Sequence, residues 1–320
     1  MKSINQVDIS IIVVNWNTRD ILKDCLRSVY EQTQDISFEL IVVDNASSDS
    51  SVSMVKSEFP QVILIVNKEN RGFAAANNQG MQIANGRYVL LLNSDTIVLD
   101  GAIQKTLVFG DKHPEAAVVG CRVLNPDKSL QPTCFMYPSL LNLFLSSTYL
   151  YKSFPRSRFF GRERMTWWFR DDVREVEVVT GCFMLVRKEA IETVGMMDES
   201  FFMYAEETDW CYRFKKVGWK LLFTPEAQIV HIGGQSSKKI KGEMLIQLRM
   251  SILYFIKKNY TNIYFVGAAT LTVIFLMIRI PVWFIKGIFL RNSKQEAFIR
   301  VAAYYDGIRK TMKLICSNKA

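Results

Sequence analysis

Short apolar runs alternate with amphipathic stretches along the first third of the chain. Four mostly apolar runs, bounded by polar residues and typical of buried strands, lie at 9–14, 38–43, 62–66 and 88–92. The stretches between them predict helices. Thr18 is expected to cap the first, and Gly86 is expected to end the alanine-rich one at 72–85 as a C-cap. Strands that alternate with helices in short units predict an α/β fold with a doubly wound, mainly parallel sheet and helices on both faces.

The middle of the chain has a less regular pattern. Residues 137–174 are rich in aromatic and arginine residues, which indicates either an irregular, partly mobile segment near an acceptor site or a packed surface subdomain. The other elements predicted here are strands at 118–124, 176–186, 219–223 and 227–231 and helices at 102–109 and 206–217.

The C-terminal quarter is apolar and basic. An amphipathic helix is predicted at 242–258, and residues 263–285 are apolar except for Arg279. A membrane span needs about 20 apolar residues, but an arginine at mid-bilayer is costly and the stretch is basic on both flanks. We therefore expect a helix that lies in, or dips into, the inner face of a membrane, with a basic tail on anionic lipid. A re-entrant hairpin and a helix buried against the enzyme or a partner subunit are the alternatives.

Composition narrows the classes of function. The 320 residues are 49% hydrophobic and carry a formal charge of +9, which suits an anionic partner. From residue 281 onward there are eight Lys or Arg residues against Glu296 and Asp306. The six cysteines include no C-x-x-C pair, which counts against a zinc site or a disulfide framework. No G-x-G-x-x-G follows the first run, which counts against a dinucleotide-binding dehydrogenase, and no nucleic-acid-binding motif occurs.

The polar N-terminus leads straight into the first strand. Residues 1–8 lack the apolar core of a signal peptide. We therefore expect the catalytic part to stay in the cytoplasm.

Polar residues follow two of the predicted strands, at the edge where open α/β sheets bind ligands. Asp44 could accept the imide N–H of uracil or thymine, or could simply cap a turn. Asp95, in Asn93-Ser94-Asp95, could bind Mg²⁺ or Mn²⁺ and bridge to a diphosphate, or could be an ordinary turn residue. Asn93 is expected to help position the sugar or ribose.

A loop and helix start at Asn70-Arg71-Gly72-Phe73 suits phosphate, because Gly72 allows close backbone approach and Arg71 is nearby. An ordinary loop-to-helix start is the alternative.

Two further features could supply acid–base and metal chemistry. Glu206 and Glu207 are adjacent, and their repulsion could raise one pKa toward that of a general base. The alternative is a solvated acidic helix start. His231 ends an apolar run and could complete a metal site with Asp95, or could be structural.

In combination these motifs resemble the family 2 glycosyltransferases of the GT-A fold, most closely their rhamnosyltransferase-type bacterial members. The resemblance covers about residues 8 to 260. It is carried by Asp44-Asn45, Asn70-Arg71-Gly72-Phe73, Asn93-Ser94-Asp95, the motif Val-Thr-Gly-Cys-Phe-Met at 179–184, Asp-Glu-Ser-Phe-Phe at 198–202, Glu206-Glu207-Thr208-Asp209 and His231.

The resemblance implies a role for each matching residue. The donor would be bound by Asn15, Asn17, Asp44, Asn45, Arg71, Gly72, Asn93, Ser94 and Asp95. The acceptor side would hold Gly181, Asp209 and Trp210, and the metal ligands would be Asp95 and His231. Glu207, with Glu206 beside it, would be the catalytic base. The chain departs from the family pattern in two places: Asn93 replaces the first Asp of D-x-D, and Glu207 replaces the usual Asp of the acidic pair, which leaves open which glutamate is the base.

The resemblance also implies a domain plan and a reaction. Residues 1–240 would be a catalytic domain, with a nucleotide-binding half at 1–112 and an acceptor half at 113–240, and residues 241–320 a helical membrane-associating region. The reaction would be an inverting, Mg²⁺- or Mn²⁺-dependent transfer of rhamnose or a similar sugar in cell-surface glycan synthesis. A dTDP- or UDP-sugar would be the donor and a hydroxyl of a lipid-linked or polysaccharide acceptor would attack it. The enzyme would be peripheral or monotopic at the cytoplasmic face of the inner membrane, and homo-oligomerisation is left open.

Two rival functions remain at this point. A nucleotidyltransferase of the same fold should carry a glycine-rich, basic loop after the first strand, where this chain has Asn15-Trp16-Asn17-Thr18. A non-catalytic membrane-bound glycan- or nucleotide-binding protein would not need the complete set of acidic motifs.

Overall fold

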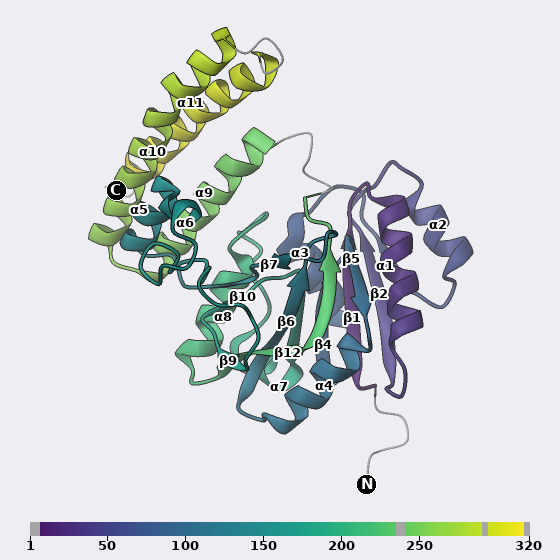
Figure 1. Ribbon diagram of the computed structural model, residues 1–320. Helices are drawn as coiled ribbons and strands as arrows, with labels where there is room; N and C mark the ends of the chain where they lie inside the picture. Colours follow the sequence, from purple (N-terminus) through teal and green to yellow (C-terminus); the bar gives the residue numbers. More distant parts are fainter. Residues whose placement is uncertain (1–6, 235–240, 290–293, 317–320) are drawn as a thin grey trace. The chain divides into compact units, whose positions relative to one another are not determined.

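The computed structural model describes residues 7–234, 241–289 and 294–316, which form two compact units (Figure 1). The first holds the described residues up to 137, with 164–202 and 206–234. The second holds 138–163, 203–205 and the described residues from 241 onward. Arg291 and Lys319 of the predicted basic tail lie outside the described residues.

The first unit is built on a mixed sheet whose principal strands run in the order β3-β2-β1-β4-β11-β6-β12-β5. These strands are β1 (Ile9–Asn15), β2 (Phe38–Asp44), β3 (Ile63–Val66), β4 (Tyr88–Asn93), β5 (Thr96–Leu99), β6 (Ala116–Leu124), β11 (Phe183–Arg187) and β12 (Lys220–His231). In the series β3, β2, β1 and β4, each strand pairs in parallel with the next, and β6 and β12 are also parallel. Strands β11 and β5 are antiparallel to their neighbours. The predicted α/β fold with a mainly parallel sheet is confirmed.

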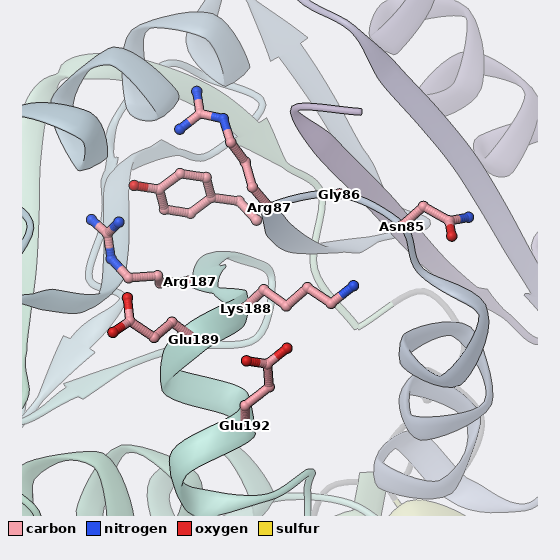
Figure 2. Close-up of a pocket in the computed structure, with 8 residues that line it drawn as sticks. Asn85, Gly86, Arg87, Arg187, Lys188, Glu189 and Glu192 are labelled. Carbon is pink, nitrogen blue, oxygen red and sulfur yellow. The ribbon is translucent and has the colours of Figure 1, made fainter. Parts of the chain in front are cut away.

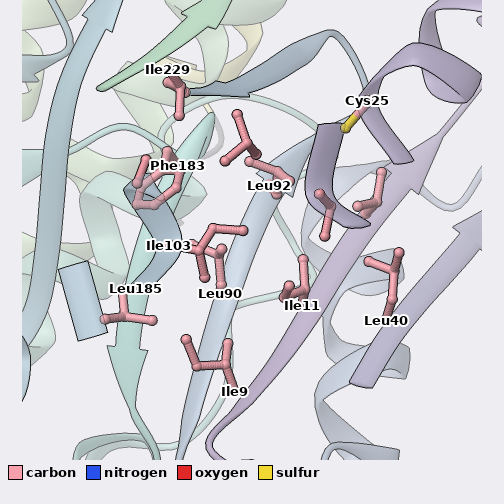
Figure 3. Close-up of a cluster of buried hydrophobic side chains, with 14 of the residues drawn as sticks. Ile9, Ile11, Cys25, Leu40, Leu90, Leu92, Ile103, Phe183, Leu185 and Ile229 are labelled. Atoms are coloured by element: carbon pink, nitrogen blue, oxygen red, sulfur yellow. The ribbon is translucent and has the colours of Figure 1, made fainter. Parts of the chain in front are cut away.

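Helices cover both faces of this sheet. They are α1 (Arg19–Gln32), α2 (Ser51–Glu58), α3 (Gly72–Ile83), α4 (Ala102–Lys112), α7 (Lys188–Val194) and α8 (Glu206–Lys216). Ile11 of β1 belongs to a core shared with α1, α2 and α4, part of which is drawn in Figure 3. Ile12 belongs to a core shared with α3, α7 and α8. Successive side chains of one strand therefore enter two different cores, which explains why the strand is apolar along most of its length.

The structure differs from the predicted elements in the acceptor half. The predicted strand 176–186 is divided into β10 (Val178–Val179), which pairs with β8 (Cys134–Phe135), and β11. Gly181 lies at this break, where an added Cβ would come within 3.0 Å of the Phe73 ring. The two strands predicted at 219–223 and 227–231 are one strand, β12, with an irregular register against β6.

Gly86 does not cap α3. The C-cap is Ala84, and Gly86 lies at the start of the run into β4. A Cβ at position 86 would lie 2.4 Å from the backbone nitrogen of Ser10, so this glycine permits close packing of two backbone segments.

The second unit is helical. It contains α5 (Leu140–Thr148), α6 (Leu150–Ser153), α9 (Lys241–Asn259), α10 (Asn262–Phe289) and α11 (Lys294–Cys316). The segment 137–174 therefore includes two helices, but residues 154–173 have turns and bends in place of helix or strand, so each alternative describes part of it. Ile246, Phe275, Leu276 and Tyr304 form the core between α9, α10 and α11.

Side chains of α9 also hold the short segment 203–205, which belongs to this unit. The carbonyl oxygen of Met203 accepts hydrogen bonds from Ser251 Oγ at 2.8 Å and Gln247 Nε2 at 3.5 Å. Tyr204 and Ala205 follow with left-handed backbone, φ +70° and +65°. The next residue is Glu206, where α8 begins.

Helix α10 is long and apolar enough to cross a membrane by length and composition, with a mean hydropathy of 2.1 over its most apolar window. One of its faces is unburied within the unit and carries Ile263, Val266, Ile274, Met277, Ile278, Val282, Ile285 and Phe289. The Arg279 side chain packs against two aromatic rings. Its guanidinium lies 4.0 Å from the Phe275 ring centroid and 4.7 Å from that of Tyr149.

Candidate active site

The site is built at the carboxyl ends of β1, β2 and β4, as the sequence predicted. Asp44 ends β2 and is 1% exposed. Its carboxylate accepts a hydrogen bond from Asn15 Nδ2 at 2.9 Å and another from the Ser47 backbone N–H at 2.9 Å. Asn15 ends the neighbouring strand β1 and also donates to Ser47 Oγ at 3.0 Å. The ends of two parallel strands are therefore joined through Asp44.

Thr18 extends this network to β4. It occupies the N-cap position of α1 but makes no side-chain cap, which corrects the predicted role. Its hydroxyl instead donates to Asn15 Oδ1 at 2.7 Å and lies 3.1 Å from Ser94 Oγ. Ser94 follows β4 and precedes Asp95. A continuous path of hydrogen bonds thus leads from Asp44 to the Asn93-Ser94-Asp95 motif.

Asp95 meets His231, from the end of β12, although 136 positions separate them in the sequence. His231 Nε2 lies 3.1 Å from Asp95 Oδ1 and 3.2 Å from Asn93 Nδ2. Both residues are largely buried, with side chains 11% and 15% exposed for Asp95 and His231. The pairing of β5 with β12 sets this contact, because Thr96 is the register partner of His231.

This pair fits a divalent cation. A carboxylate oxygen and an imidazole nitrogen are both metal ligands, and two ligands at right angles about 2.1 Å from a cation lie about 3.0 Å apart. Over the described ranges there is no group of three or more His, Cys, Asp or Glu side chains that could hold a metal. Other ligands would have to come from phosphate oxygens and water, as is common for Mg²⁺.

Asn45 orders the loop that leads into α3. Its Nδ2 donates to Asn70 Oδ1 and to the Gly72 carbonyl, both at 3.0 Å, and its Oδ1 accepts the Arg71 backbone N–H at 3.1 Å. The N–H of Phe73 donates to the Phe202 carbonyl at 2.8 Å. These backbone donors are therefore used inside the protein, and the predicted phosphate contact at this helix start rests on the Arg71 side chain.

Gly72 does allow a close approach to its backbone, but the group that approaches is the Phe202 carbonyl, and the contact with a phosphate stays a prediction. The φ of Gly72 is +81°, and an added Cβ would lie 2.2 Å from the Phe202 carbonyl oxygen. The Arg71 guanidinium is 41% exposed and lies 3.7 Å from Glu199 Oε2. Because the pair is open to solvent, this arginine can change partners at little cost.

Asn17 lies at the outer side of the same edge. Its backbone N–H donates to Ser47 Oγ at 2.9 Å, and its side-chain oxygen accepts the Ser48 N–H at 2.7 Å. Asn17 has left-handed backbone with φ +55°, which an asparagine tolerates better than most residues. It therefore shapes the loop after β2.

Glu206 and Glu207 begin α8, and Glu206 is only 4% exposed. Burial raises the pKa of Glu206 well above its usual value, and the charge of Glu207 raises it further. Burial also raises the pKa of Glu207. Among the described residues, the Oε2 atom of each is buried without a hydrogen-bond partner. The solvated alternative is therefore wrong, since one oxygen of each carboxyl group is buried here without the partner that a buried charge normally needs.

The Cys182 thiol is within electrostatic range of both Glu207 and Asp95. Burial raises the pKa of this thiol to about 12, and the negative charges of Asp95 and Glu207 both add to the increase. The backbone N–H of Asn93 also donates to the Cys182 carbonyl at 3.1 Å. Glu207 and Asp95 are therefore near enough to act electrostatically on one side chain.

The predicted acceptor-side residues have other surroundings. Asp209 is fully buried and pairs with Arg213 at 2.9 Å, and Trp210 is fully buried and donates to the Gly195 carbonyl at 2.9 Å. Neither side chain is open to an acceptor, so we assign both a structural role that anchors α8. Gly181 faces the Phe73 ring, as described above.

Three residues of the site were not singled out as site residues by the sequence. Thr18 was expected only as a helix cap and Ser47 was not singled out, although their positions after β1 and β2 were an available signal. Gln131, in the two-residue strand β7 (Leu130–Gln131), lies against His231 and carries no periodic signal at all.

Comparisons with known proteins show the family of this chain. The family model for glycosyl transferase family 2 matches residues 10–195. The N-acetylglucosaminyl-diphospho-decaprenol L-rhamnosyltransferase of Mycobacterium tuberculosis is 25% identical over 237 residues, which are 70% of this chain and 76% of that protein. The low-salt glycan biosynthesis hexosyltransferase Agl10 of Haloferax volcanii is 25% identical over 218 residues, 65% of this chain and 62% of Agl10.

A solved structure shares the fold across nearly the whole chain. The mannosyltransferase PcManGT from Pyrobaculum calidifontis, in complex with GDP-Man and Mn²⁺, has a TM-score of 0.57 at 15% identity, covering 97% of this chain and 88% of that one. The family model spans more than half of the 320 residues. Asp44, Asn93 and His231, from three of the motifs that carried the resemblance, end strands that run in the same direction. The chain is therefore a member of glycosyl transferase family 2.

Proposed function

We propose that this protein is an inverting glycosyltransferase that moves rhamnose or a similar sugar from a nucleotide diphosphate to an acceptor hydroxyl. The observation that carries the proposal is the hydrogen-bonded path from Asp44 through Asn15 and Thr18 to Ser94, whose neighbour in the chain, Asp95, meets His231. Such a path links a group that can read a nucleobase to a group that can hold a diphosphate-bound cation. Their joint presence at one strand edge supports a nucleotide-sugar site.

Glu207 acts as the base in this proposal. Its raised pKa brings a carboxylate closer to the basicity that accepts a hydroxyl proton efficiently near neutral pH. The acceptor oxygen attacks the anomeric carbon from the face opposite the diphosphate as its proton passes to Glu207. One displacement forms the new glycosidic bond, breaks the bond to the diphosphate and inverts the anomeric configuration.

The leaving diphosphate needs positive charge beside it. Asp95 and His231 would hold Mg²⁺ or Mn²⁺, which neutralises phosphate charge when bound. Arg71 would leave its exposed contact with Glu199 for a phosphate oxygen.

Asp44 would recognise the pyrimidine. Each carboxylate oxygen has a second lone pair beyond the bonds from Asn15 and Ser47. Because Asp44 is 1% exposed, an imide N–H can reach these lone pairs only if the side chains over the carboxylate move aside. A dTDP- or UDP-sugar is the proposed donor. The relative from Mycobacterium tuberculosis, whose name gives a polyprenyl diphosphate-linked acceptor, supports a lipid-linked or growing glycan as acceptor.

A donor screen tests the proposal. The full-length protein is incubated with dTDP-, UDP- and GDP-sugars, with Mn²⁺, Mg²⁺ or EDTA, and thermal stabilisation is recorded for each. We expect stabilisation by a pyrimidine nucleotide-sugar that EDTA removes. The anomeric configuration of the transferred sugar is then read by NMR. Retention of configuration, or transfer at full rate in EDTA, would contradict the proposal.

We further propose that the enzyme works at the cytoplasmic face of the inner membrane as a peripheral or monotopic protein. The unburied apolar face of α10 supports this, with Ile263 86% and Phe289 77% exposed. The exposed residues Arg309 and Lys310 on α11 provide positive charge for anionic lipid. Arg279, stacked on protein rings near the middle of α10, argues against a simple span.

Vesicle sedimentation tests the membrane proposal separately from catalysis. We expect the protein to bind phosphatidylglycerol vesicles more strongly than phosphatidylcholine vesicles and to lose this preference at high salt. The double variant Ile274→Ser and Ile278→Ser should weaken binding to both. Equal binding by this variant and the wild-type protein would contradict a role for the α10 face.

A further inference from the structure

Gln131 makes three side-chain hydrogen bonds that together fix the direction of its amide. Its Oε1 lies 2.6 Å from His231 Nδ1, and its Nε2 lies 3.1 Å from the His231 carbonyl oxygen and 2.8 Å from Asn125 Oδ1. A carbonyl oxygen can only accept, so the group facing it must be the amide NH₂. The atom facing the imidazole is therefore the amide oxygen.

The direction of the amide determines the tautomer of His231. An amide oxygen accepts but does not donate, so Nδ1 of the imidazole must carry the proton. In the neutral ring, Nε2 is then unprotonated. It faces Asn93 Nδ2 at 3.2 Å, which donates to it, and Asp95 Oδ1 at 3.1 Å. The opposite tautomer would place a proton on Nε2 and remove its capacity as a ligand.

Gln131 is itself held from both sides. Its strand β7 pairs with the end of β6, with Gln131 opposite Val123. Asn125, which accepts from the Gln131 amide, donates its own Nδ2 to Ser129 Oγ at 2.9 Å. The amide therefore has little freedom to turn over, and the imidazole is held in one orientation.

We propose that Gln131 is a positioning residue that keeps His231 in the Nδ1–H tautomer, so that Nε2 and Asp95 are ready to bind a divalent cation together. This deepens the proposed function and rests on it, because the cation is the one that would meet the sugar-nucleotide diphosphate. Outer partners of this kind set the tautomer and basicity of metal-binding histidines, and their loss typically weakens metal binding about 10- to 100-fold.

The chain suits a direct spectroscopic test, because it has two histidines, His113 and His231. Protein labelled with ¹⁵N-histidine gives separate signals for protonated and unprotonated ring nitrogens, and the variant His113→Asn assigns them. In the wild-type protein with Mg²⁺ bound between Asp95 and His231, we expect His231 to show a protonated Nδ1 and an unprotonated Nε2. Gln131→Met keeps the length of the side chain but removes both kinds of hydrogen bond, so we expect Nε2–H to become populated.

Mn²⁺ titration followed by EPR, on the full chain without donor, gives the second readout. We expect Gln131→Met to bind Mn²⁺ about 10- to 100-fold more weakly than wild-type. Gln131→Glu keeps an acceptor for Nδ1–H, so it should retain the His231 tautomer and most of the affinity for Mn²⁺. It therefore tests the proposal even if Gln131→Met folds poorly. Gln104→Met, at a half-buried position of α4, is the matched control and should bind Mn²⁺ as the wild-type protein does.

The outcomes separate this inference from the function on which it rests. If wild-type protein binds Mn²⁺ and folded Gln131→Met binds it equally well with the same tautomer, the inference is overturned and the proposed function stands. If wild-type protein binds no Mn²⁺ with or without a nucleotide-sugar, the metal-dependent function fails and the inference fails with it.

Discussion

The two ends of strand β4 differ in how their charged residues are used. At its carboxyl end, Asn93 and Asp95 meet His231, close to the buried glutamates of α8. At its amino end, Arg87 and Tyr88 border a cavity of about 400 Å³ (Figure 2). Arg187 and Lys188 line the same cavity, with Glu189 and Glu192 from α7 on the other side from Arg87. With this cavity and its basic lining, the amino end could be taken for an anion site.

The cations at the amino end already have partners. Arg87 donates to Asp8 at 2.9 Å and to both carboxylate oxygens of Asp111. Arg187 donates to the carbonyl oxygens of Gly110, Ala116 and His113, and Lys188 to that of Ala84.

At the carboxyl end, in contrast, Glu206 and Glu207 carry buried oxygens without a hydrogen-bond partner among the described residues. Charges that have internal partners stabilise a fold, whereas buried groups left without them cost stability and mark a place where something else must bind or react.

The largest expected effect is on the rate of transfer. Glu207→Gln removes the proposed base, and we expect transfer to fall about 10²- to 10⁴-fold while the affinity for the nucleotide-sugar stays within about threefold. Initial-rate assays and calorimetry measure the two quantities. Glu192→Gln, at the amino-end cavity, is the matched control and should leave both unchanged. A Glu207→Gln protein that keeps more than a tenth of its activity would move the base elsewhere.

The pH dependence of transfer should show the same group. The base must be ionised, and burial raises the pKa of Glu207 above its usual value of 4.5. Activity should therefore fall about tenfold per pH unit once the pH drops below that raised value. We expect the acid limb of kcat/KM to have its midpoint above 4.5, with circular dichroism showing that the protein is still folded. A midpoint at or below 4.5 would argue against a buried base.

Arg87→Met should act on stability instead. The substitution removes hydrogen bonds to Asp8 and Asp111, and we expect the free energy of unfolding to fall by about 1–2 kcal/mol, less than for a fully buried pair because Arg87 is 25% exposed. Urea denaturation measures the loss. Transfer below the unfolding temperature should be unaffected. A loss of activity without a loss of stability would mean that the amino end belongs to a functional site.

Glu206→Gln should also act on stability, but in the opposite direction. The pKa of Glu206 is higher in the folded protein than in the unfolded protein. At a pH between these two pKa values, the folded protein therefore binds more protons than the unfolded protein does. The free energy of unfolding of the wild-type protein should therefore fall as pH rises through that window. Glutamine cannot ionise, so the variant should gain stability above it, at about 1.4 kcal/mol per unit of pKa difference. Urea denaturation at pH 5 and pH 8 tests this, and an unchanged pH dependence would show that Glu206 does not hold the extra proton.

The sequence predicted the parallel half of the sheet because each strand there is a complete apolar run with a polar end. Asp44 and Asn93 were placed correctly for the same reason. Strand β5 was missed, because Thr96–Leu99 begins only three residues after Asn93 and looks like a continuation of β4. The surroundings of Glu206 were also unpredictable, since two adjacent carboxylates at a helix start are normally solvated.

Contacts between distant short elements could not be foreseen either. Gln131 and His231 are joined across 100 residues by a two-residue strand, which is too short to leave a periodic pattern. Asp209 and Trp210 were misplaced because membership in a motif says nothing about the direction of a side chain on its helix. Helix α8 turns these two inward, as their full burial shows.

The hydrogen bonds to the Met203 carbonyl have a practical consequence for making this enzyme in shortened form. Ending the protein at residue 240 to improve solubility would keep every residue of the site, yet it would delete Ser251 and Gln247, which hold the backbone three residues before Glu206. A truncated protein could therefore bind its nucleotide-sugar normally and still turn over poorly, and its low activity should not be taken as that of the native enzyme.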